Sequence, residues 1–166
     1  MSQNSTPTST PLYPVNLDIG GKRCLVVGGG PVAARKVKAL LLCGGLVRII
    51  SPHATDTITR LAETGKIDWV KRTYRAGDAK DAFLIFGATD DPEVQKHIAE
   101  DAARYHVLLN SAYDPELSDF HVPAKIRRRD FVIAVSTGGG SPALALLLKE
   151  QLANEYGEEY GVLVEL

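Results

Sequence analysis

The chain has 166 residues, of which 45% are hydrophobic, and its 19 basic and 20 acidic side chains leave a formal net charge of -1. This length is enough for one well-buried core and a small appended unit, and it excludes two full-sized domains. The nearly balanced charge creates no global field that would attract nucleic acid or a membrane surface, so an anionic ligand must be bound by a local cluster.

Two cysteines, Cys24 and Cys43, lie within apolar runs, a placement typical of buried free thiols in a reducing compartment. No apolar run approaches the ~18 residues that a membrane span needs. The first residues also lack the charged and apolar regions of a secretory signal. We therefore expect a cytoplasmic protein whose partners include no nucleic acid and no membrane.

Residues 1–11 are polar and aperiodic, and we expect them to be a disordered lead-in. Beyond them, apolar runs alternate with segments of helical spacing. We expect strands at residues 24–27, 46–50, 67–71, 83–87 and 107–110, and helices at 31–42, 55–63 and 92–105. This alternation predicts an α/β fold with a doubly wound, parallel sheet.

The alternation ends after Asn110, where a smaller unit begins. We expect strands at residues 120–124 and 131–136 on either side of a basic turn at 125–130, and an amphipathic helix at 141–156. The predicted domains are therefore a nucleotide-binding domain at 12–112 and a second segment at 113–166.

The strongest motif, at residues 28–33, reads Gly-Gly-Gly-Pro-Val-Ala between a predicted strand and a predicted helix. In a G-x-G-x-x-A pattern of this kind, Gly28 permits a tight turn, Gly30 lets the backbone approach a pyrophosphate, and Ala33 allows close packing of helix and strand. Pro31 suits the first helical position. The motif indicates a Rossmann-type dinucleotide site, with a simple glycine turn as the alternative.

An acidic residue is expected about 20 residues after such a motif, where it would bind the ribose hydroxyls of NAD. Here the second strand is followed by Ser51, Pro52 and His53 instead. Ser51 and His53 are able to bind ribose through weaker hydrogen bonds, and Arg48 leaves NADP open. Residue chemistry alone does not choose between NAD and NADP.

Two further loops follow predicted strands. Residues 87–91 end the fourth strand at the edge where ligands bind in such folds, which favours cofactor contact by Thr89 and Asp90; the alternative is capping of the next helix by Asp90 or Asp91. Residues 136–142 form either a capped helix entry or a second anion cradle for substrate.

The histidines show no metal-ligand spacing with one another or with the cysteines, so we expect no metal site. The three arginines at residues 127–129 are interpreted as a solvated turn, with steering of an anionic substrate as the alternative.

Taken together, these motifs resemble the N-terminal part of sirohaem synthases and the stand-alone precorrin-2 dehydrogenases. The matching pieces are Tyr13-Pro14 with Leu17, and residues 23–36, 87–91, 110–120 and 135–144. The resemblance implies NAD as cofactor, oxidation of precorrin-2 to sirohydrochlorin in sirohaem biosynthesis, and a homodimer joined through the segment after Asn110. Some members of this family also insert ferrous iron into the product.

By position, the resemblance also assigns site residues. The implied cofactor contacts are Gly28, Gly29, Gly30, Pro31, Val32, Pro52 and His53, to which the residue chemistry adds Thr89 and Asp90. The expected substrate contacts are Asn110, Tyr113, Thr137, Gly138, Gly139 and Ser141.

The chain departs from the family at residues 110–113, where members usually have Asn-Val-Val-Asp with an Asp implicated in catalysis and chelation. Here Tyr113 occupies that position and Asp114 follows it. A carboxylate can accept a proton near neutral pH, whereas a phenol can only donate one. We therefore expect Asp114 to supply the catalytic group, with its use as a turn-forming residue as the alternative.

The sequence thus predicts an NAD-dependent oxidoreductase that acts on the small-molecule tetrapyrrole precorrin-2. A metal chelatase with weak dehydrogenase activity and a non-catalytic NAD-binding sensor domain are the two alternatives. Binding of a tetrapyrrole would exclude the sensor, and anaerobic metal insertion without NAD would identify the chelatase.

Overall fold

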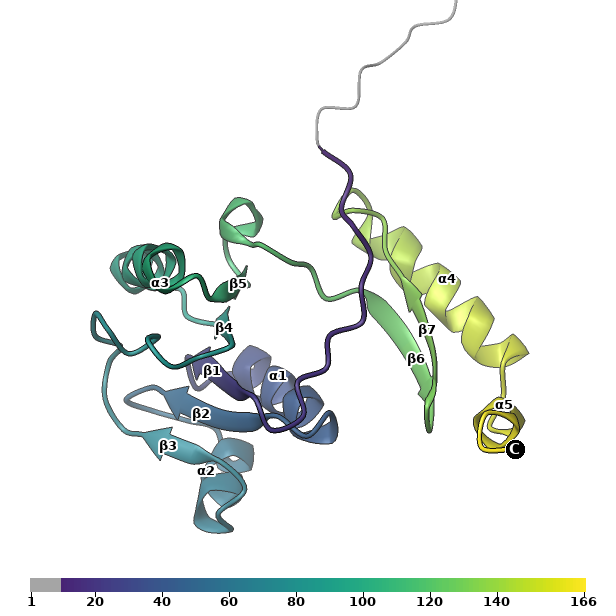
Figure 1. Cartoon of the computed structure of the whole chain (residues 1–166), viewed down its shortest axis with the longest axis horizontal. Coiled ribbons are helices and arrows are strands. Elements are labelled where there is room, and N and C mark those ends of the chain that lie inside the picture. Colours follow the sequence, from purple (N-terminus) through teal and green to yellow (C-terminus); the bar gives the residue numbers. More distant parts are fainter. Residues whose placement is uncertain (1–9) are drawn as a thin grey trace, which may run out of the picture. The chain divides into compact units, whose positions relative to one another are not determined.

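A computed structural model describes residues 10–166, which divide into two compact units (Figure 1). The larger unit is Val15–Phe120, and the smaller one combines residues 10–14 with residues 121–166. Most of the lead-in expected at residues 1–11, namely residues 1–9, lies outside the described residues.

The larger unit is built on a five-stranded parallel sheet in the order β3-β2-β1-β4-β5. Its strands are β1 (Arg23–Val27), β2 (Leu46–Ile50), β3 (Asp68–Val70), β4 (Leu84–Gly87) and β5 (Leu108–Ser111). Its helices are α1 (Pro31–Leu42), α2 (Asp56–Glu63) and α3 (Pro92–Tyr105), with a short 3-10 turn, η1, at Pro115–Leu117. The predicted α/β class and Rossmann-type topology are confirmed.

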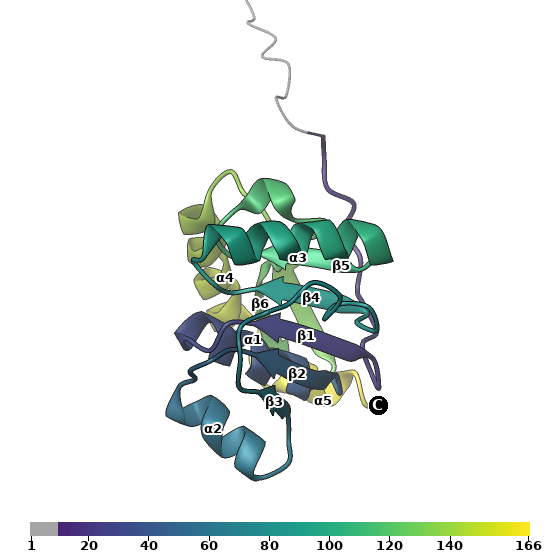
Figure 2. The same ribbon diagram turned by 90° about the vertical axis from the view of Figure 1, so that its left-hand side faces the viewer.

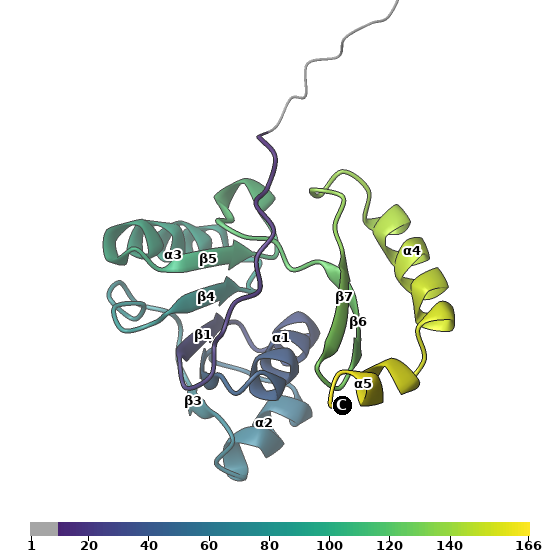
Figure 3. The same ribbon diagram turned by 45° about the vertical axis from the view of Figure 1, so that its right-hand side comes forward.

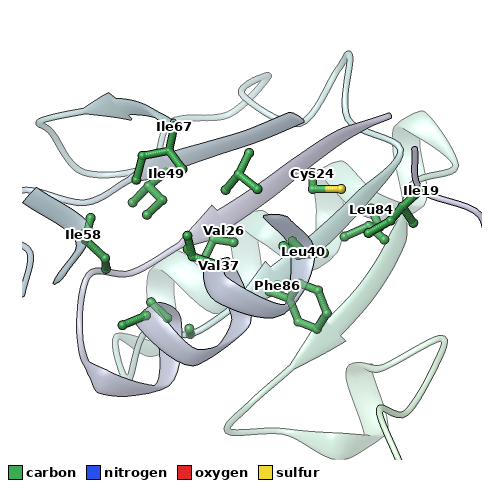
Figure 4. Close-up of a cluster of buried hydrophobic side chains, with 14 residues drawn as sticks. Ile19, Cys24, Val26, Val37, Leu40, Ile49, Ile58, Ile67, Leu84 and Phe86 are labelled. Carbon is green, nitrogen blue, oxygen red and sulfur yellow. The ribbon is translucent and has the colours of Figure 1, made fainter. Parts of the chain in front are cut away.

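Alternate residues of β1 fill two separate cores, because successive side chains of a strand point to opposite faces of the sheet. Cys24 and Val26 pack with residues of α1 and α2 on one face, in the cluster of Figure 4. Leu25 and Val27 pack with residues of α3 on the other. Figure 2 shows α3 alongside β4 and β5. Helices therefore cover both faces of the sheet, as a doubly wound fold requires.

The larger unit continues past β5 to Phe120, eight residues beyond the expected domain end at 112. Several hydrogen bonds hold this extension against β5; among them, the Asp119 N–H donates to the Leu109 carbonyl (2.8 Å), and the Asn110 amide donates to the Phe120 carbonyl (2.9 Å). The Phe120 ring also packs edge-on against Phe86, with centroids 5.5 Å apart. The loop after β5 is thus an integral part of the sheet's carboxyl edge.

The smaller unit is an antiparallel hairpin with two helices. Strands β6 (Ala124–Arg128) and β7 (Phe131–Val135) pair along their full length, and α4 (Pro142–Glu155) packs against the hairpin (Figure 3). A final short helix, α5 (Glu159–Leu163), brings Tyr160 to 5.4 Å from the Phe131 ring.

The structure corrects three sequence predictions in this unit. The strand expected at 120–124 is in fact β6, so most of the supposed basic turn at 125–130 is strand. Only Arg129 and Asp130 turn the chain, with Arg129 at a φ of 55°. Helix α4 exposes Leu144, Leu146 and Leu147 and is not amphipathic in the expected way. Helix α5 was not predicted.

Candidate functional site

The carboxyl edge of the larger sheet contains the point where strand order reverses. β1 is flanked by β2 on one side and β4 on the other, so the connections that leave β1 and β3 run in opposite directions. Ligands of open α/β sheets bind in the crevice at such a point. The glycine motif follows β1 there.

Gly28 and Gly29 join the loops of three adjacent strands by close backbone contact. Gly28 has a φ of +121°, and a Cβ on it would lie 2.3 Å from the carbonyl oxygen of Ala88, after β4. A Cβ on Gly29 would lie 1.9 Å from the carbonyl oxygen of His53, after β2. Neither position has room for a side chain, so the close approach of these loops requires glycine at both positions.

Gly30 differs from its two neighbours because the space beside it is open. A Cβ there would meet nothing within 4 Å, and its φ of -77° is accessible to any residue. Gly30 is also the N-cap of α1 and places no side chain over the helix end. The N–H groups of Val32 and Ala33 lack intrahelical acceptors, as at every helix start.

The start of α1 therefore has the properties of a pyrophosphate site. Its first turn carries no acidic residue, Pro31 occupies the first helical position, and the approach over Gly30 is unobstructed. Free N–H groups and the positive end of the helix dipole favour an anion in that place. The residues present fit a dinucleotide.

The loop after β2 assigns different tasks to Ser51 and His53. The Ser51 hydroxyl donates to the carbonyl of His53 (2.6 Å), and the Trp69 indole donates to the carbonyl of Ser51 (3.0 Å). Ser51 is buried and shapes the loop, whereas Pro52 and His53 are exposed beside the glycine motif. Of the two residues considered for ribose binding, only His53 has its side chain available.

Arg48, which had left NADP open, does not face this edge. It pairs with Asp68 on β3 at 2.7 Å, and both residues line a cavity of about 530 Å³ at the amino ends of the strands. Its lining also includes Arg23, the first residue of β1, and Gly45, which immediately precedes β2. It therefore lies at the opposite edge of the sheet from the glycine motif.

The loop after β4 contains two aspartates, of which one caps a helix and the other is exposed to solvent. Asp91 caps α3 by accepting from the N–H groups of Glu93 (3.0 Å) and Val94 (3.2 Å), the alternative considered for this loop. Asp90 is exposed. The backbone N–H of Thr89 lies 3.3 Å from the ideal Cβ position of Gly28, so Thr89 adjoins the expected pyrophosphate site.

Asn110 lies in β5, and the loop that follows the strand carries Tyr113 and Asp114. Besides its bond to Phe120, the Asn110 side chain accepts from Lys36 Nζ at 3.3 Å. Tyr113 and Asp114 are exposed. One oxygen of Asp114 accepts from the N–H of Glu116 (3.1 Å) and so caps η1. Asp114 is thus a turn-forming residue in this structure, with its second carboxylate oxygen outside that contact.

Three residues that sequence reasoning missed organise these loops: Lys36, Gln95 and Ser111. Gln95 donates to the carbonyl of Thr89 (2.6 Å) and accepts from the Ser111 hydroxyl (3.3 Å). The side chains of Gln95 and Ser111 are buried at the carboxyl edge. A polar residue among the apolar positions of a predicted helix, as Gln95 is in α3, was the signal available in the sequence.

The glycine-rich loop of the smaller unit is held by its own side chains. Thr137 Oγ1 accepts from the Ser141 N–H and donates to the Ser141 carbonyl, both at 3.1 Å. Ser141 caps α4 by accepting from the Leu144 N–H (3.3 Å). Gly138 and Gly139 adopt positive φ angles of 61° and 86° between them. These contacts agree with the interpretation of residues 136–142 as a capped helix entry.

No group of three or more His, Cys, Asp or Glu side chains suited to a metal ion occurs among residues 10–166. Within that same stretch, no helix has the length and apolar character required to cross a bilayer.

Comparison with known proteins identifies the family. A family model described as "Putative NAD(P)-binding" matches residues 15–124, the whole of the larger unit and the start of β6. The chain belongs to this NAD(P)-binding family.

Its relatives also cover the smaller unit. The chain is 38% identical over 160 residues to the siroheme synthase of Xylella fastidiosa and 37% identical over 148 residues to that of Nitrosococcus oceani. These matches cover 96% and 89% of this chain but only 34% and 32% of the relatives, so the chain spans about a third of their length. The solved structure of SirC, a precorrin-2 dehydrogenase, matches with a TM-score of 0.79 and 29% identity, covering 93% of this chain and 76% of that one.

Proposed function

We propose that this protein is an NAD-dependent dehydrogenase that oxidises precorrin-2 to sirohydrochlorin in sirohaem biosynthesis. The observation that carries the proposal is the open approach to the start of α1 over Gly30, in a chain that matches a precorrin-2 dehydrogenase structure across both of its units. That approach would receive the pyrophosphate of the cofactor.

NAD is favoured over NADP because Arg48, the residue that had left NADP open, is engaged elsewhere. Arg48 is paired with Asp68 and lines the cavity at the amino edge. Exposed His53, with Pro52 beside it, is then the polar side chain that would meet the ribose, while Gly28, Gly29, Pro31 and Val32 form the cofactor loop. Thr89 and Asp90 complete this set from the β4 loop.

When bound, NAD supplies the acceptor for the hydride removed from the substrate. The chain's own residues bind both molecules, position them and receive the proton that leaves with the hydride. We assign the proton-accepting or orienting role to Asp114, because Tyr113 as a phenol cannot accept a proton in its place. The Asp114 oxygen that does not cap η1 is the atom for this role.

The substrate contacts proposed from the sequence are Asn110, Tyr113, Thr137, Gly138, Gly139 and Ser141. Exposed Tyr113 and the exposed glycines offer surface to a ligand. The role of Asn110 toward the substrate would be indirect, because its side-chain amide already donates to the Phe120 carbonyl and accepts from Lys36 Nζ. Its contribution would be to keep the Tyr113–Asp114 loop in position.

A homodimer and a cytoplasmic location belong to the same proposal. The exposed leucines of α4 and the unpaired edges of a two-stranded hairpin are surfaces that a second copy would cover. Light scattering at micromolar concentration tests the dimer, and a monomer would contradict it.

An anaerobic assay of precorrin-2 with NAD, followed by the absorbance of sirohydrochlorin, tests the activity. Product formation that depends on NAD is the expected result. Insertion of iron or cobalt into sirohydrochlorin without NAD, in a protein that makes no sirohydrochlorin, would favour a chelatase instead.

A further inference from the structure

The β6–β7 hairpin presents two different faces. Ile126 is buried at 5% exposure, on the face that packs against α4, and Phe131 lies on the same side. The alternate residues Lys125 and Arg127 are exposed on the other face, as the two-residue period of a strand requires. Register places Ala134 opposite Lys125 and Val132 opposite Arg127. The outward face thus combines two cations with two small apolar side chains.

The four cationic side chains of the hairpin form two groups: within residues 10–166, two have carboxylate partners and two do not. Arg128 lies 3.3 Å from Glu158 and also donates to the Ala153 carbonyl, and Arg129 pairs with Glu165. Neither Lys125 nor Arg127 has a carboxylate partner within the part of the chain that the structure describes, although Arg127 donates to the Arg129 carbonyl at 3.4 Å.

Arg128 and Arg129 therefore use their charge in contacts within the fold, whereas the charges of Lys125 and Arg127 are available to a ligand. The glutamates at the C-terminal end neutralise the two arginines at the hairpin tip, where α5 packs and Gly161 comes close to the Arg128 backbone. The two outward cations share one strand face and sit two residues apart. Like charges left unpaired on neighbouring positions repel each other, so an anion that contacts both would relieve that repulsion.

We propose that the outward face of the hairpin, through Lys125 and Arg127, binds peripheral carboxylates of the tetrapyrrole substrate. This inference rests on the proposed function. Precorrin-2 and sirohydrochlorin carry acetate and propionate side chains around the whole macrocycle, so they offer several carboxylates near one another. Val132 and Ala134 are small enough to let a broad ring approach both cations.

Binding of a polycarboxylate porphyrin tests the assignment directly. Uroporphyrin retains every acetate and propionate, and coproporphyrin has the same ring with methyl groups in place of the acetates. Fluorescence titration of both probes would be compared for the wild-type protein, for Lys125→Gln/Arg127→Gln, and for a control, Lys38→Gln/Lys96→Gln. The control removes the same charge from exposed positions on α1 and α3.

We expect the hairpin variant to bind uroporphyrin about fivefold to tenfold more weakly at low salt, the range that two exposed ion pairs give. The loss should be smaller for coproporphyrin, should shrink as salt is added, and should leave NAD affinity unchanged. The control variant should bind as the wild type does.

Two outcomes would overturn the proposal in distinguishable ways. If the wild type binds uroporphyrin and the hairpin variant binds it equally well, the role of Lys125 and Arg127 is wrong while the proposed function stands. If the folded wild type binds NAD but neither porphyrin, and also fails to oxidise precorrin-2, the proposed function fails and this inference with it.

Discussion

The Ser111 hydroxyl donates a hydrogen bond of 3.3 Å to Oε1 of Gln95, and the same oxygen of Ser111 accepts from the N–H of Asp114 at 2.9 Å. A side chain at the end of β5 thereby connects α3 to the loop that carries the proposed catalytic carboxylate. Gln95 in turn holds the Thr89 carbonyl after β4. The loops that would face cofactor and substrate are therefore tied to one buried pair.

The first prediction concerns Ser111→Ala, which removes the oxygen that holds the Asp114 and Tyr113 N–H groups. Because Oε1 of buried Gln95 also loses this donor, we expect a loss of about 1–3 kcal/mol in the free energy of unfolding. A looser loop should also lower turnover about tenfold or more, since small displacements of catalytic groups are costly. NAD affinity should stay unchanged, because Gln95 keeps its own bond to the Thr89 carbonyl. Urea denaturation, calorimetry and the anaerobic assay measure the three quantities.

The exposed variant Thr64→Ala, which alters a hydroxyl at the end of α2, serves as its control. Wild-type turnover in Ser111→Ala would show that the hydrogen bond stabilises the loop without positioning Asp114.

The second prediction separates two glycines of one motif. Gly30→Val introduces a side chain into open space at an ordinary φ, so the protein should fold but bind NAD at least about tenfold more weakly, because the side chain occupies the path of the pyrophosphate. Gly28→Ala should instead destabilise the fold, since its Cβ would lie 2.3 Å from a carbonyl oxygen at a φ of +121°.

Thermal unfolding and calorimetry distinguish the two effects. A folded Gly30→Val protein with wild-type NAD affinity would refute the assignment of the pyrophosphate site.

Local chemistry was enough to predict the glycine motif and the two longest helices of the larger unit. α1 and α3 begin and end at the expected residues, because each has proline at its first position and a clear break in apolar spacing after its last turn. The strands of the sheet were placed within a residue of their ends, since the strands of a parallel sheet are short, mostly apolar runs.

The remaining features depend on contacts that no local pattern contains. The three consecutive arginines suggested a turn, yet Ile126 is buried against α4 and makes the segment a half-buried strand. The contact between Gln95 and Ser111 joins residues 16 positions apart, and it exists only because α3 returns the chain to the edge beside β5. Asp114 was recognised as a residue with two possible roles, and the structure adds its contact with Glu116.

The third prediction concerns stability at high pH. Tyr74 is buried and donates to Asp101 at 2.6 Å; burial first, and then this hydrogen bond, raise the pKa of its phenol above the ordinary value. The folded state therefore keeps a proton that the unfolded chain loses near pH 10. The stability that this provides is complete below about pH 10 and is lost as the pH rises toward the folded-state pKa.

In Tyr74→Phe the free energy of unfolding should fall by about 1–3 kcal/mol at neutral pH, because Asp101 keeps only its bond from the Gly77 N–H. The decline above about pH 10 should also be shallower than in the wild type. Cys24, whose pKa burial and the nearby Cys43 raise to about 11, contributes equally to both proteins and so cancels in the comparison. Parallel urea curves at every pH would contradict the prediction.

The last prediction concerns Asp114 and Tyr113. Asp114→Asn removes the negative charge but keeps an oxygen that can accept from the Glu116 N–H, so η1 should remain capped and the protein folded. If Asp114 accepts or orients the proton, turnover should fall about 10²-fold or more, the usual contribution of a positioned acid or base. NAD affinity should not change, since the cofactor loop is not altered.

Tyr113→Asp tests the neighbouring position, where the family usually has its carboxylate. Tyr113 is 56% exposed, so the smaller side chain should be tolerated. A large gain in turnover would show that the carboxylate is needed at 113, and that the loop held by Ser111 presents that position to the substrate. Unchanged turnover in Asp114→Asn, with its fold verified by circular dichroism, would leave Asp114 as the cap of η1 alone. Reduced turnover in Asp114→Asn together with no gain in Tyr113→Asp is the pattern that we expect, because the Asp114 carboxylate would then perform the task one residue farther along the chain.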